Sequence, residues 1–200
     1  MTLFVKICGV TTEEAVAAAV AAGADAIGFV FHAASPRDIE PRRAAQLARQ
    51  LPRGVQCVAV TRHPDQELVD RILDELEPDV WQTDARDFDS VRLPADIERW
   101  PVLRERSQAP AGSRRVLFES PASGSGERAD WAAASVLART SELILGGGLD
   151  RMTIGRAIAT VRPFGVDVSS GVETAPGVKD ARRIREFIVR ARIGSQAMRA

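Results

Sequence analysis

The sequence has little cysteine, no surplus of charge of either sign and no long apolar run, and each absence excludes a class of protein. Its 200 residues carry 27 basic and 27 acidic side chains, so the formal net charge is zero. A nucleic-acid-binding protein needs a basic surplus to neutralise phosphates. No apolar run reaches the roughly 18 residues of a membrane-spanning helix, and the first residues lack the basic and apolar regions of a signal peptide. Two cysteines are too few for a disulfide scaffold or a four-cysteine zinc site. We therefore expect a cytoplasmic protein that binds neither nucleic acid nor membrane.

Short runs rich in β-branched residues alternate with helix-like segments along the chain. The runs predicted as strands are Leu3–Cys8, Ala26–Phe31, Val55–Arg62, Asp79–Gln82, Pro101–Arg104, Arg115–Phe118, Leu143–Leu145 and Gly165–Val168. Apolar residues recur at helical spacing in Asp65–Glu77 and Asp180–Arg192. Strands and helices that alternate in this way form parallel βαβ units.

The number of these units decides between two architectures. An open doubly wound sheet and a closed barrel both fit the alternation, and eight units favour a single (β/α)8 barrel over residues 1–193. The segments after Asp84 and Arg104 are too short or too polar for full helices, so we expect trimmed or missing helices there. Residues 194–200 have no apolar periodicity, and we expect a disordered tail.

Unusual residues end the predicted strands, where a parallel barrel places its chemistry. Cys8 closes the first strand on the same face as Lys6. A lone cysteine is more often a small buried hydrophobe, which is our interpretation of Cys57 within the third strand. Arg37, in Ser-Pro-Arg after the second strand, is either a fork for a carboxylate or an ordinary solvated arginine. Glu119 ends the sixth strand before a Gly/Ser-rich loop and is either a general acid under a lid or an exposed loop glutamate.

The last two strand ends carry the strongest signal. The seventh strand runs into Gly146-Gly147-Gly148, and the eighth runs into Ser169-Ser170-Gly171. Glycine-rich backbone and the start of a short helix both present N–H groups to an anion. Barrel enzymes frequently hold phosphate on these two loops, so we expect a phosphate site there rather than tight turns alone. The two histidines, His32 and His63, are not spaced as a metal pair, and no nucleotide-binding or zinc-protease motif is present. We expect neither a metal nor a cofactor.

Taken together and in order, the motifs resemble the phosphoribosylanthranilate isomerase family. The stretches that carry the resemblance are Lys6-Ile7-Cys8-Gly9, Gly23–Phe31 with Ser35-Pro36-Arg37, Gly124-Ser125-Gly126 with Asp130-Trp131, Gly147-Gly148-Leu149, and Gly165–Glu173 with Pro176-Gly177 and Lys179-Asp180. The resemblance implies a (β/α)8 barrel and a cofactor-free Amadori rearrangement of a phosphorylated sugar substrate in tryptophan biosynthesis.

The resemblance also implies a role for particular side chains. Cys8 is the implied general base and Glu119 the implied general acid. Arg37 is implied to contact the substrate carboxylate, and Asp167 to lie near the sugar. We expect Lys6 to help Cys8 lose its proton, and desolvation beneath the lid to help Glu119 keep one. The implied phosphate ligands are the backbone groups of Gly147, Gly148, Ser170 and Gly171.

Two positions depart from the family pattern. The family acid is usually aspartate, whereas Glu119 is one methylene longer, and the strand-four motif Q-L-H-G is Gln82-Thr83-Asp84-Ala85 here. These departures leave two alternatives to a working isomerase. One is a related isomerase with shifted specificity toward another phosphoribosyl amine, and the other is a catalytically silent barrel that binds phosphate. Since the helices carry many charges on their exposed faces, we expect a monomer.

Overall fold

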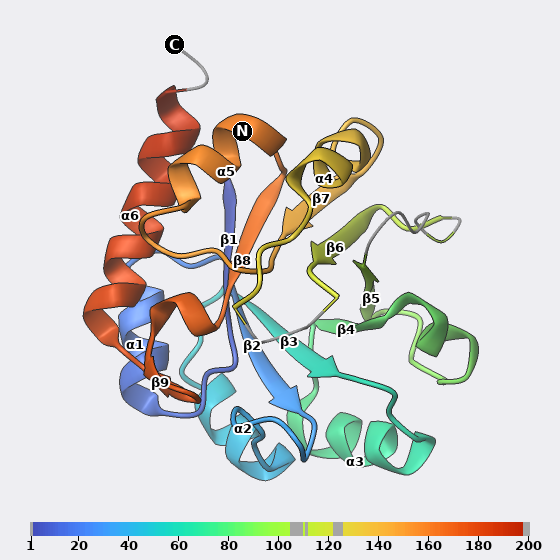
Figure 1. Cartoon of the computed structure of the whole chain (residues 1–200). Coiled ribbons are helices and arrows are strands. Elements are labelled where there is room, and N and C mark those ends of the chain that lie inside the picture. The colour runs from blue at the N-terminus through green and yellow to red at the C-terminus, as the bar shows by residue number, and fades with distance from the viewer. Residues whose placement is uncertain (1, 105–109, 111, 122–125, 198–200) are drawn as a thin grey trace.

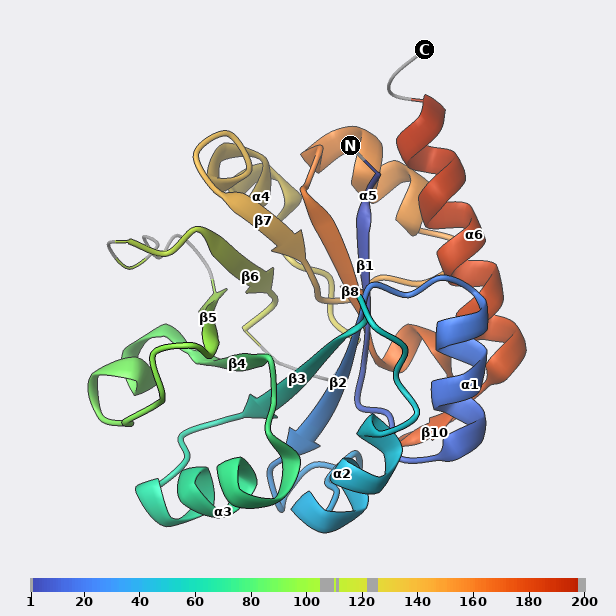
Figure 2. The same cartoon turned by 180° about the vertical axis from the view of Figure 1, so that it is seen from behind.

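The computed structural model describes residues 2–104, 110, 112–121 and 126–197, which form a closed parallel barrel. Its strands are β1 (Phe4–Cys8), β2 (Ala26–Phe31), β3 (Gln56–Thr61), β4 (Val80–Asp84), β5 (Glu98–Arg104), β6 (Arg115–Glu119), β7 (Glu142–Leu145) and β8 (Gly165–Val168). They follow one another around the barrel in chain order, and β8 closes it against β1. Figures 1 and 2 show the strands inside a ring of helices. The predicted (β/α)8 fold is confirmed.

The described residues form six α-helices, which cover the outside of this barrel (Figures 1 and 2). Their bounds are α1 (Glu13–Ala21), α2 (Pro41–Ala48), α3 (Gln66–Leu76), α4 (Trp131–Leu137), α5 (Ile154–Val161) and α6 (Ala181–Ala197). In α3, the expected spacing of Leu68, Ile72 and Leu76 is confirmed for Ile72 and Leu76, which are buried together with Val69, whereas Leu68 is half-buried. The Asp65 carboxylate caps this helix by accepting a hydrogen bond from the Leu68 amide. The helical ring therefore forms because each helix has one apolar face to bury.

Side chains fill the inside of the barrel and close it at the amino-terminal ends of the strands. The inward-facing cluster consists of Ala26, Val58, Val80, Trp100, Val102, Leu117 and Ile144. Below it, the Arg115 guanidinium lies 4.5 Å from the centroid of the Phe164 ring and 5.2 Å from that of Phe4. Arg115 and Phe4 begin their strands, so this plug is at the amino-terminal ends. Chemistry is left to the carboxyl-terminal rim.

The strand register sets which side chains meet at that rim. Lys6 on β1 pairs with Asp167 on β8, and Cys8 pairs with Gly28 on β2. Strand β4 extends two residues beyond its predicted end, because Thr83 and Asp84 pair with β5. Asp84 is therefore a strand-end residue at the rim. After β8, the chain forms a 3-10 helix η2 (Ser170–Val172) and a small hairpin of β9 (Glu173–Ala175) and β10 (Val178–Lys179).

Other expectations about the connections have different outcomes. The trimmed helix after Asp84 is confirmed as the 3-10 helix η1 (Ala85–Asp89), whereas the connection after Arg104 falls largely on residues 105–109 and 111, outside the described residues. The tail expected from residue 194 is corrected for residues 194–197: these continue α6, and Ser195 is buried. Residues 198–200 lie outside the described part. Within that part, we find no helix that is long and apolar enough to span a membrane.

Candidate active site

A cavity of about 470 Å3 opens at the carboxyl-terminal ends of the strands. Four residues predicted from the sequence line it together: Cys8, Arg37, Glu119 and Asp167. A larger groove of about 740 Å3 lies at the opposite end, beside residues such as Thr2 and Phe164, and has none of the predicted residues in its lining. The chemistry of the rim cavity, not its size, identifies it as the candidate site.

Cys8, Lys6 and Asp167 form one side of this cavity. The Lys6 side chain is fully buried, and its Nζ lies 3.0 Å from Asp167 Oδ1. Gly28 on the neighbouring strand makes room for this group, since a Cβ there would lie 3.0 Å from both Cys8 Sγ and Lys6 Nζ. The expectation that Cys8 and Lys6 share a face of β1 is confirmed. Cys57, by contrast, is buried in the apolar layer as predicted.

Burial and charge act in opposite directions on these groups. Burial raises the pKa of the Cys8 thiol, and the opposing effect of the Lys6 ammonium is smaller. Burial lowers the pKa of Lys6, but the Asp167 carboxylate and the Cys8 sulfur together outweigh it and raise that pKa overall. Lys6 therefore favours the thiolate as we expected, although its charge is largely engaged by Asp167. The net effect on Cys8 is a raised pKa, which favours the thiol over the thiolate.

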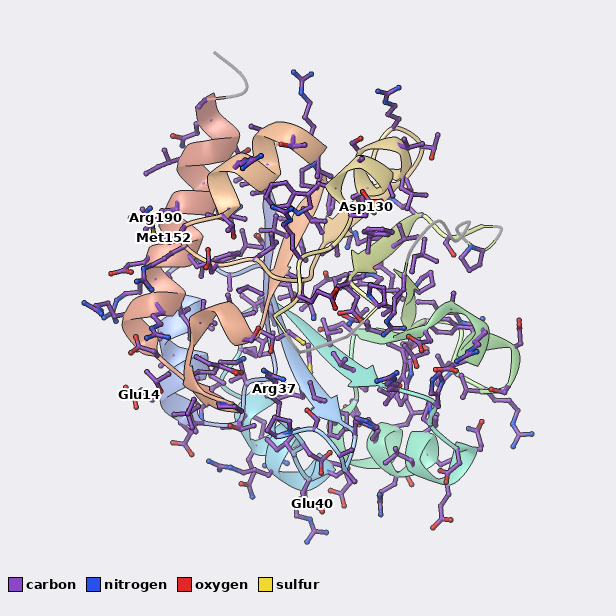
Figure 3. All side chains as sticks on the ribbon, in the orientation of Figure 1. Glu14, Arg37, Glu40, Asp130, Met152 and Arg190 are labelled. Carbon is purple, nitrogen blue, oxygen red and sulfur yellow. The ribbon has the colours of Figure 1, made fainter. Side chains whose placement is uncertain are left out.

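Arg37 is held from behind by a buried carboxylate. Its Nε and Nη2 donate to the two Glu173 carboxylate oxygens, each at 2.8 Å, and Lys179 Nζ lies 2.6 Å from Glu173 Oε1. Burial opposes ionisation of Glu173, but Arg37 and Lys179 lower its pKa overall. In Figure 3, Arg37 lies toward the centre of the molecule, whereas Glu14 and Glu40 lie at its periphery. The pair fixes the guanidinium on the rim.

Lysine usage was a signal that sequence reasoning missed at this position. Lys6 and Lys179 are the only two lysines in the sequence, and the remaining basic residues are arginines. Both lysine ammonium groups are buried at the site. All other basic positions are arginine, so the two lysines mark places where the compact ammonium group, rather than a planar guanidinium, is needed.

Glu119 contacts a cation that the sequence did not indicate. Arg104 Nη2 donates to Glu119 Oε1 at 2.7 Å, while Arg104 Nη1 donates to Asp84. A guanidinium beside a carboxylate favours its ionised form, which is the opposite of the protonated acid that we expected. The proposed lid over Glu119 includes residues 122–125, which lie outside the described residues.

Asp84 also belongs to a cluster that, among the described residues, has the composition of a metal site. Ligand atoms of His63, Asp84 and Asp87 all lie within 4.8 Å of one another. His63 Nδ1 is 2.8 Å from Asp87 Oδ1, and two guanidinium groups reach the same atoms: Arg104 on Asp84 and Arg86, 3.3 Å from His63 Nε2. Because guanidinium groups already contact Asp84 and His63, we interpret the cluster as an ion-pair network.

The two predicted phosphate loops have tightly constrained backbones. Gly147 and Gly148 have φ values of +77° and +63°, in the left-handed region that favours glycine. A Cβ at Gly171 would lie 1.9 Å from the Leu149 carbonyl oxygen, so the loops after β7 and β8 are in direct contact. Among the described residues, no acceptor is found for the backbone N–H groups of Gly147, Gly148, Ser170 and Gly171.

Gln82 is a further polar residue on this cavity. It is only 4% exposed, and its Oε1 atom has no hydrogen-bond partner among the described residues. Its side chain lines the cavity beside Arg104 and Glu119. A buried acceptor without a partner is costly, and here it faces the space that a ligand would occupy. The sequence signal was the strand-four motif Gln82-Thr83-Asp84-Ala85, whose first residue agrees with the motif that the family resemblance implies.

Known proteins resemble this chain over nearly its whole length. A family model described as N-(5'phosphoribosyl)anthranilate (PRA) isomerase matches residues 5–190. The N-(5'-phosphoribosyl)anthranilate isomerase of Pelobacter propionicus is 41% identical over 194 residues, covering 92% of this chain and 93% of the relative. That of Bordetella pertussis is 37% identical and covers 98% of both chains.

Solved structures give the same result. TrpF from Jonesia denitrificans superposes with a TM-score of 0.81 at 32% identity, covering 97% of this chain and 98% of the other. A phosphoribosyl anthranilate isomerase in complex with reduced 1-(o-carboxyphenylamino)-1-deoxyribulose 5-phosphate superposes with a TM-score of 0.76 at 29% identity, covering 94% and 98%. The family match, the identities and the barrel agree, and the chain belongs to the N-(5'-phosphoribosyl)anthranilate isomerase family.

Proposed function

We propose that this chain catalyses the cofactor-free rearrangement of N-(5'-phosphoribosyl)anthranilate to the 1-deoxyribulose 5-phosphate product in tryptophan biosynthesis. The observation that carries the proposal is the cavity that Cys8 and Glu119 line together with Arg37 and Asp167. A thiol and a carboxyl group on one cavity are the acid and base that an aldose-to-ketose isomerisation requires. The solved relative binds a ligand with a carboxylate, an aryl amine and a phosphate, and these groups are the ones for which the site has partners.

Charge and backbone donors give the substrate an orientation. Arg37 is fixed by Glu173 and offers a planar donor to the anthranilate carboxylate. The donor-rich loops after β7 and β8 would hold the phosphate through Gly147, Gly148, Ser170 and Gly171. Asp167, which lines the same cavity and pairs with Lys6, would contact the sugar. A substrate anchored at both ends places its ribose carbons between Cys8 and Glu119.

The reaction then needs two proton transfers. Glu119 gives a proton to the furanose ring oxygen as the C1–O bond breaks, and the anthranilate nitrogen supplies the electrons that form the Schiff base. The Cys8 thiolate removes the proton from C2, and those electrons neutralise the iminium to give an enolamine. The enolamine tautomerises to the ketone, so no external oxidant or reductant takes part. Gln82 has an open acceptor for a substrate hydroxyl or amine.

The assembly and location of the enzyme belong to the same proposal. We expect a monomer in the cytoplasm that needs no nucleic acid and no membrane. The zero net charge supports the second part, because it gives no basic surplus for phosphate backbones or anionic lipids.

Steady-state turnover of phosphoribosylanthranilate, followed by its loss of fluorescence, tests the proposal. The wild-type chain is compared with Cys8→Ser, Glu119→Gln and Glu119→Asp. We expect Cys8→Ser and Glu119→Gln to lower kcat by at least 10²-fold, which is the usual contribution of a positioned acid or base. Glu119→Asp keeps an ionisable carboxyl group, and we expect it to retain measurable activity.

Two outcomes would contradict this function. Tight binding of phosphoribosylanthranilate without any turnover by the wild-type chain would indicate a silent phosphate-binding barrel. Turnover of another phosphoribosyl amine in preference to phosphoribosylanthranilate would indicate shifted specificity. Unchanged kcat in Cys8→Ser would leave the reaction in place and remove Cys8 as its base.

A further inference from the structure

The two departures from the family pattern meet on one guanidinium. The family resemblance implies a histidine at the position of Asp84 and an aspartate at that of Glu119, and in this structure both side chains accept hydrogen bonds from Arg104. The strand register enforces this meeting, since Arg104 is the direct partner of Glu119 on β6 and Asp84 is the partner of Val102 on β5. The three side chains come from three consecutive strand ends. They therefore form one unit, and neither substitution acts alone.

The charges in this unit explain why both carboxylates are needed. With Arg104 alone beside it, Glu119 would have a full counter-ion and would hold its proton weakly. Asp84 engages the other arm of the same guanidinium, so the unit carries two negative charges against one positive charge. The second carboxylate reduces the hold of Arg104 on Glu119 and favours uptake of a proton. Glu119, which must be protonated before it acts as an acid, can then keep the Arg104 guanidinium beside it, and Arg104 orients its side chain.

We propose that Asp84 and Arg104 are positioning residues that together set the orientation and the proton affinity of Glu119. Arg104 fixes the longer glutamate side chain within the cavity, and Asp84 offsets the charge that Arg104 would otherwise impose. This inference rests on the proposed function, in which Glu119 is the general acid. Charged groups of the described residues that also face the unit include His63, 3.4 Å from Asp84 Oδ2, together with Asp87 and Arg86 of η1.

The pH dependence of kcat separates this role from a merely structural one. Asp84→Asn removes one negative charge from beside Arg104 and Glu119, so the alkaline limb of kcat should move to lower pH by about one unit. Activity at pH 8 should then fall about tenfold, with KM changed less than about twofold. In Arg104→Gln the limb should move to higher pH, while the maximal kcat falls because Glu119 loses its orientation. Arg104→Lys should restore the position of the limb and part of kcat.

The double variant and a control complete the experiment. If Asp84 acts through Arg104, the two substitutions should be non-additive: Asp84→Asn should move the limb much less in the Arg104→Gln background than in the wild type, so the limb of the double variant should lie near that of Arg104→Gln. Glu142→Gln is the matched control. Glu142 is likewise a carboxylate that accepts hydrogen bonds from arginine, in its case from Arg114 and Arg115, but it lies at the opposite end of the barrel. Its limb should not move. An unmoved limb in both Asp84→Asn and Arg104→Gln would overturn the proposal.

A second measurement keeps this inference distinct from the reaction itself. The carboxyl carbon resonance of Glu119, assigned by its loss in Glu119→Gln, can be titrated by NMR without substrate. A lower titration midpoint in Asp84→Asn than in the wild type supports the unit even if phosphoribosylanthranilate is not turned over. Equal midpoints in a catalytically active wild type and variant would refute the inference and leave the proposed function standing.

Discussion

At the scale of single residues, Gly28 shows how closely Cys8, Lys6 and Asp167 are packed on one side of the cavity. It lies on β2 opposite Cys8, and the space that a side chain would fill is taken by the Cys8 sulfur and the end of Lys6. A Cβ at this position would force the thiol or the ammonium to shift by a few tenths of an ångström, so glycine allows the observed arrangement with Asp167. A packing requirement of this kind is local, and it gives a sharp test of where Cys8 must lie.

Gly28→Ala should impair catalysis much more than folding. The new methyl group would lie 3.0 Å from both Cys8 Sγ and Lys6 Nζ, so one of them must move. Because a shift of about 1 Å can cost on the order of 10² in rate, we expect kcat to fall at least tenfold while KM changes little. Gly155→Ala is the control: no atom lies within 4 Å of its Cβ position, and it is in the helix α5. It should keep full activity, and equal kcat values in both variants would refute the packing argument.

At the scale of elements, one buried carboxylate joins the loop after β2 to the hairpin after β8. Glu173 on β9 binds Arg37, which is in the loop after β2, and Lys179, which is on β10. All three side chains are at least nine-tenths buried. Removal of one partner from a buried ion pair leaves charges without compensation. The contact therefore both holds the hairpin against the barrel and orients the proposed carboxylate ligand.

Glu173→Gln should lower stability and weaken substrate binding together. Arg37 and Lys179 remain buried without their counter-ion, so we expect the free energy of unfolding to fall by roughly 3 kcal/mol. The KM should rise more than kcat falls, since Arg37 is proposed to contact the bound carboxylate. Urea unfolding and steady-state kinetics measure the two effects. Glu13→Gln, which removes an exposed partner of Arg43, should change stability by less than about 1 kcal/mol, and similar losses in both variants would contradict this role.

The elements themselves were largely predictable, whereas their contacts were not. The strands β1, β2 and β8 lie within a residue of their predicted bounds because each is a short apolar run bounded by turn residues. Strand β4 ran on to Asp84, since pairing with β5 compensates for the polar Thr83-Asp84 sequence. A pattern along one chain segment contains no information on which strand will supply a partner.

The same distinction divides the candidate site. Cys8, Arg37, Glu119 and Asp167 were found because strand ends and family motifs mark them, and the cavity brings them together. Arg104 was missed because its role depends on closure of the barrel, which sets it beside Glu119 in the register of β5 and β6. Long-range pairing of this kind requires the tertiary structure.

At the scale of the whole molecule, buried ionisable groups limit the pH range of stability on both sides. On the acid side, burial opposes ionisation of Glu173 and Asp87, but their hydrogen-bond partners lower each pKa overall. A carboxylate with a lowered pKa stabilises the fold above its unfolded pKa, and that contribution is lost as the pH falls through the folded value. The fold should therefore weaken below about pH 4, near the ordinary carboxyl values.

On the alkaline side, the prediction depends on Cys57. Burial, assisted by the nearby Asp79 carboxylate, raises the pKa of this thiol to about 12. The unfolded chain loses the thiol proton near pH 9 while the folded chain keeps it, so the stabilisation is complete below pH 9 and declines as the pH rises toward 12. Each pH unit in this window should lower the free energy of unfolding by about 1.4 kcal/mol from Cys57 alone.

Urea unfolding from pH 7 to pH 11 should therefore show a steeper decline of the free energy of unfolding for the wild type than for Cys57→Ala. The variant has a constant loss from its smaller side chain but lacks the titrating group. Parallel declines in the two proteins would show that other groups, such as the buried Lys6 and Cys8, set the alkaline limit.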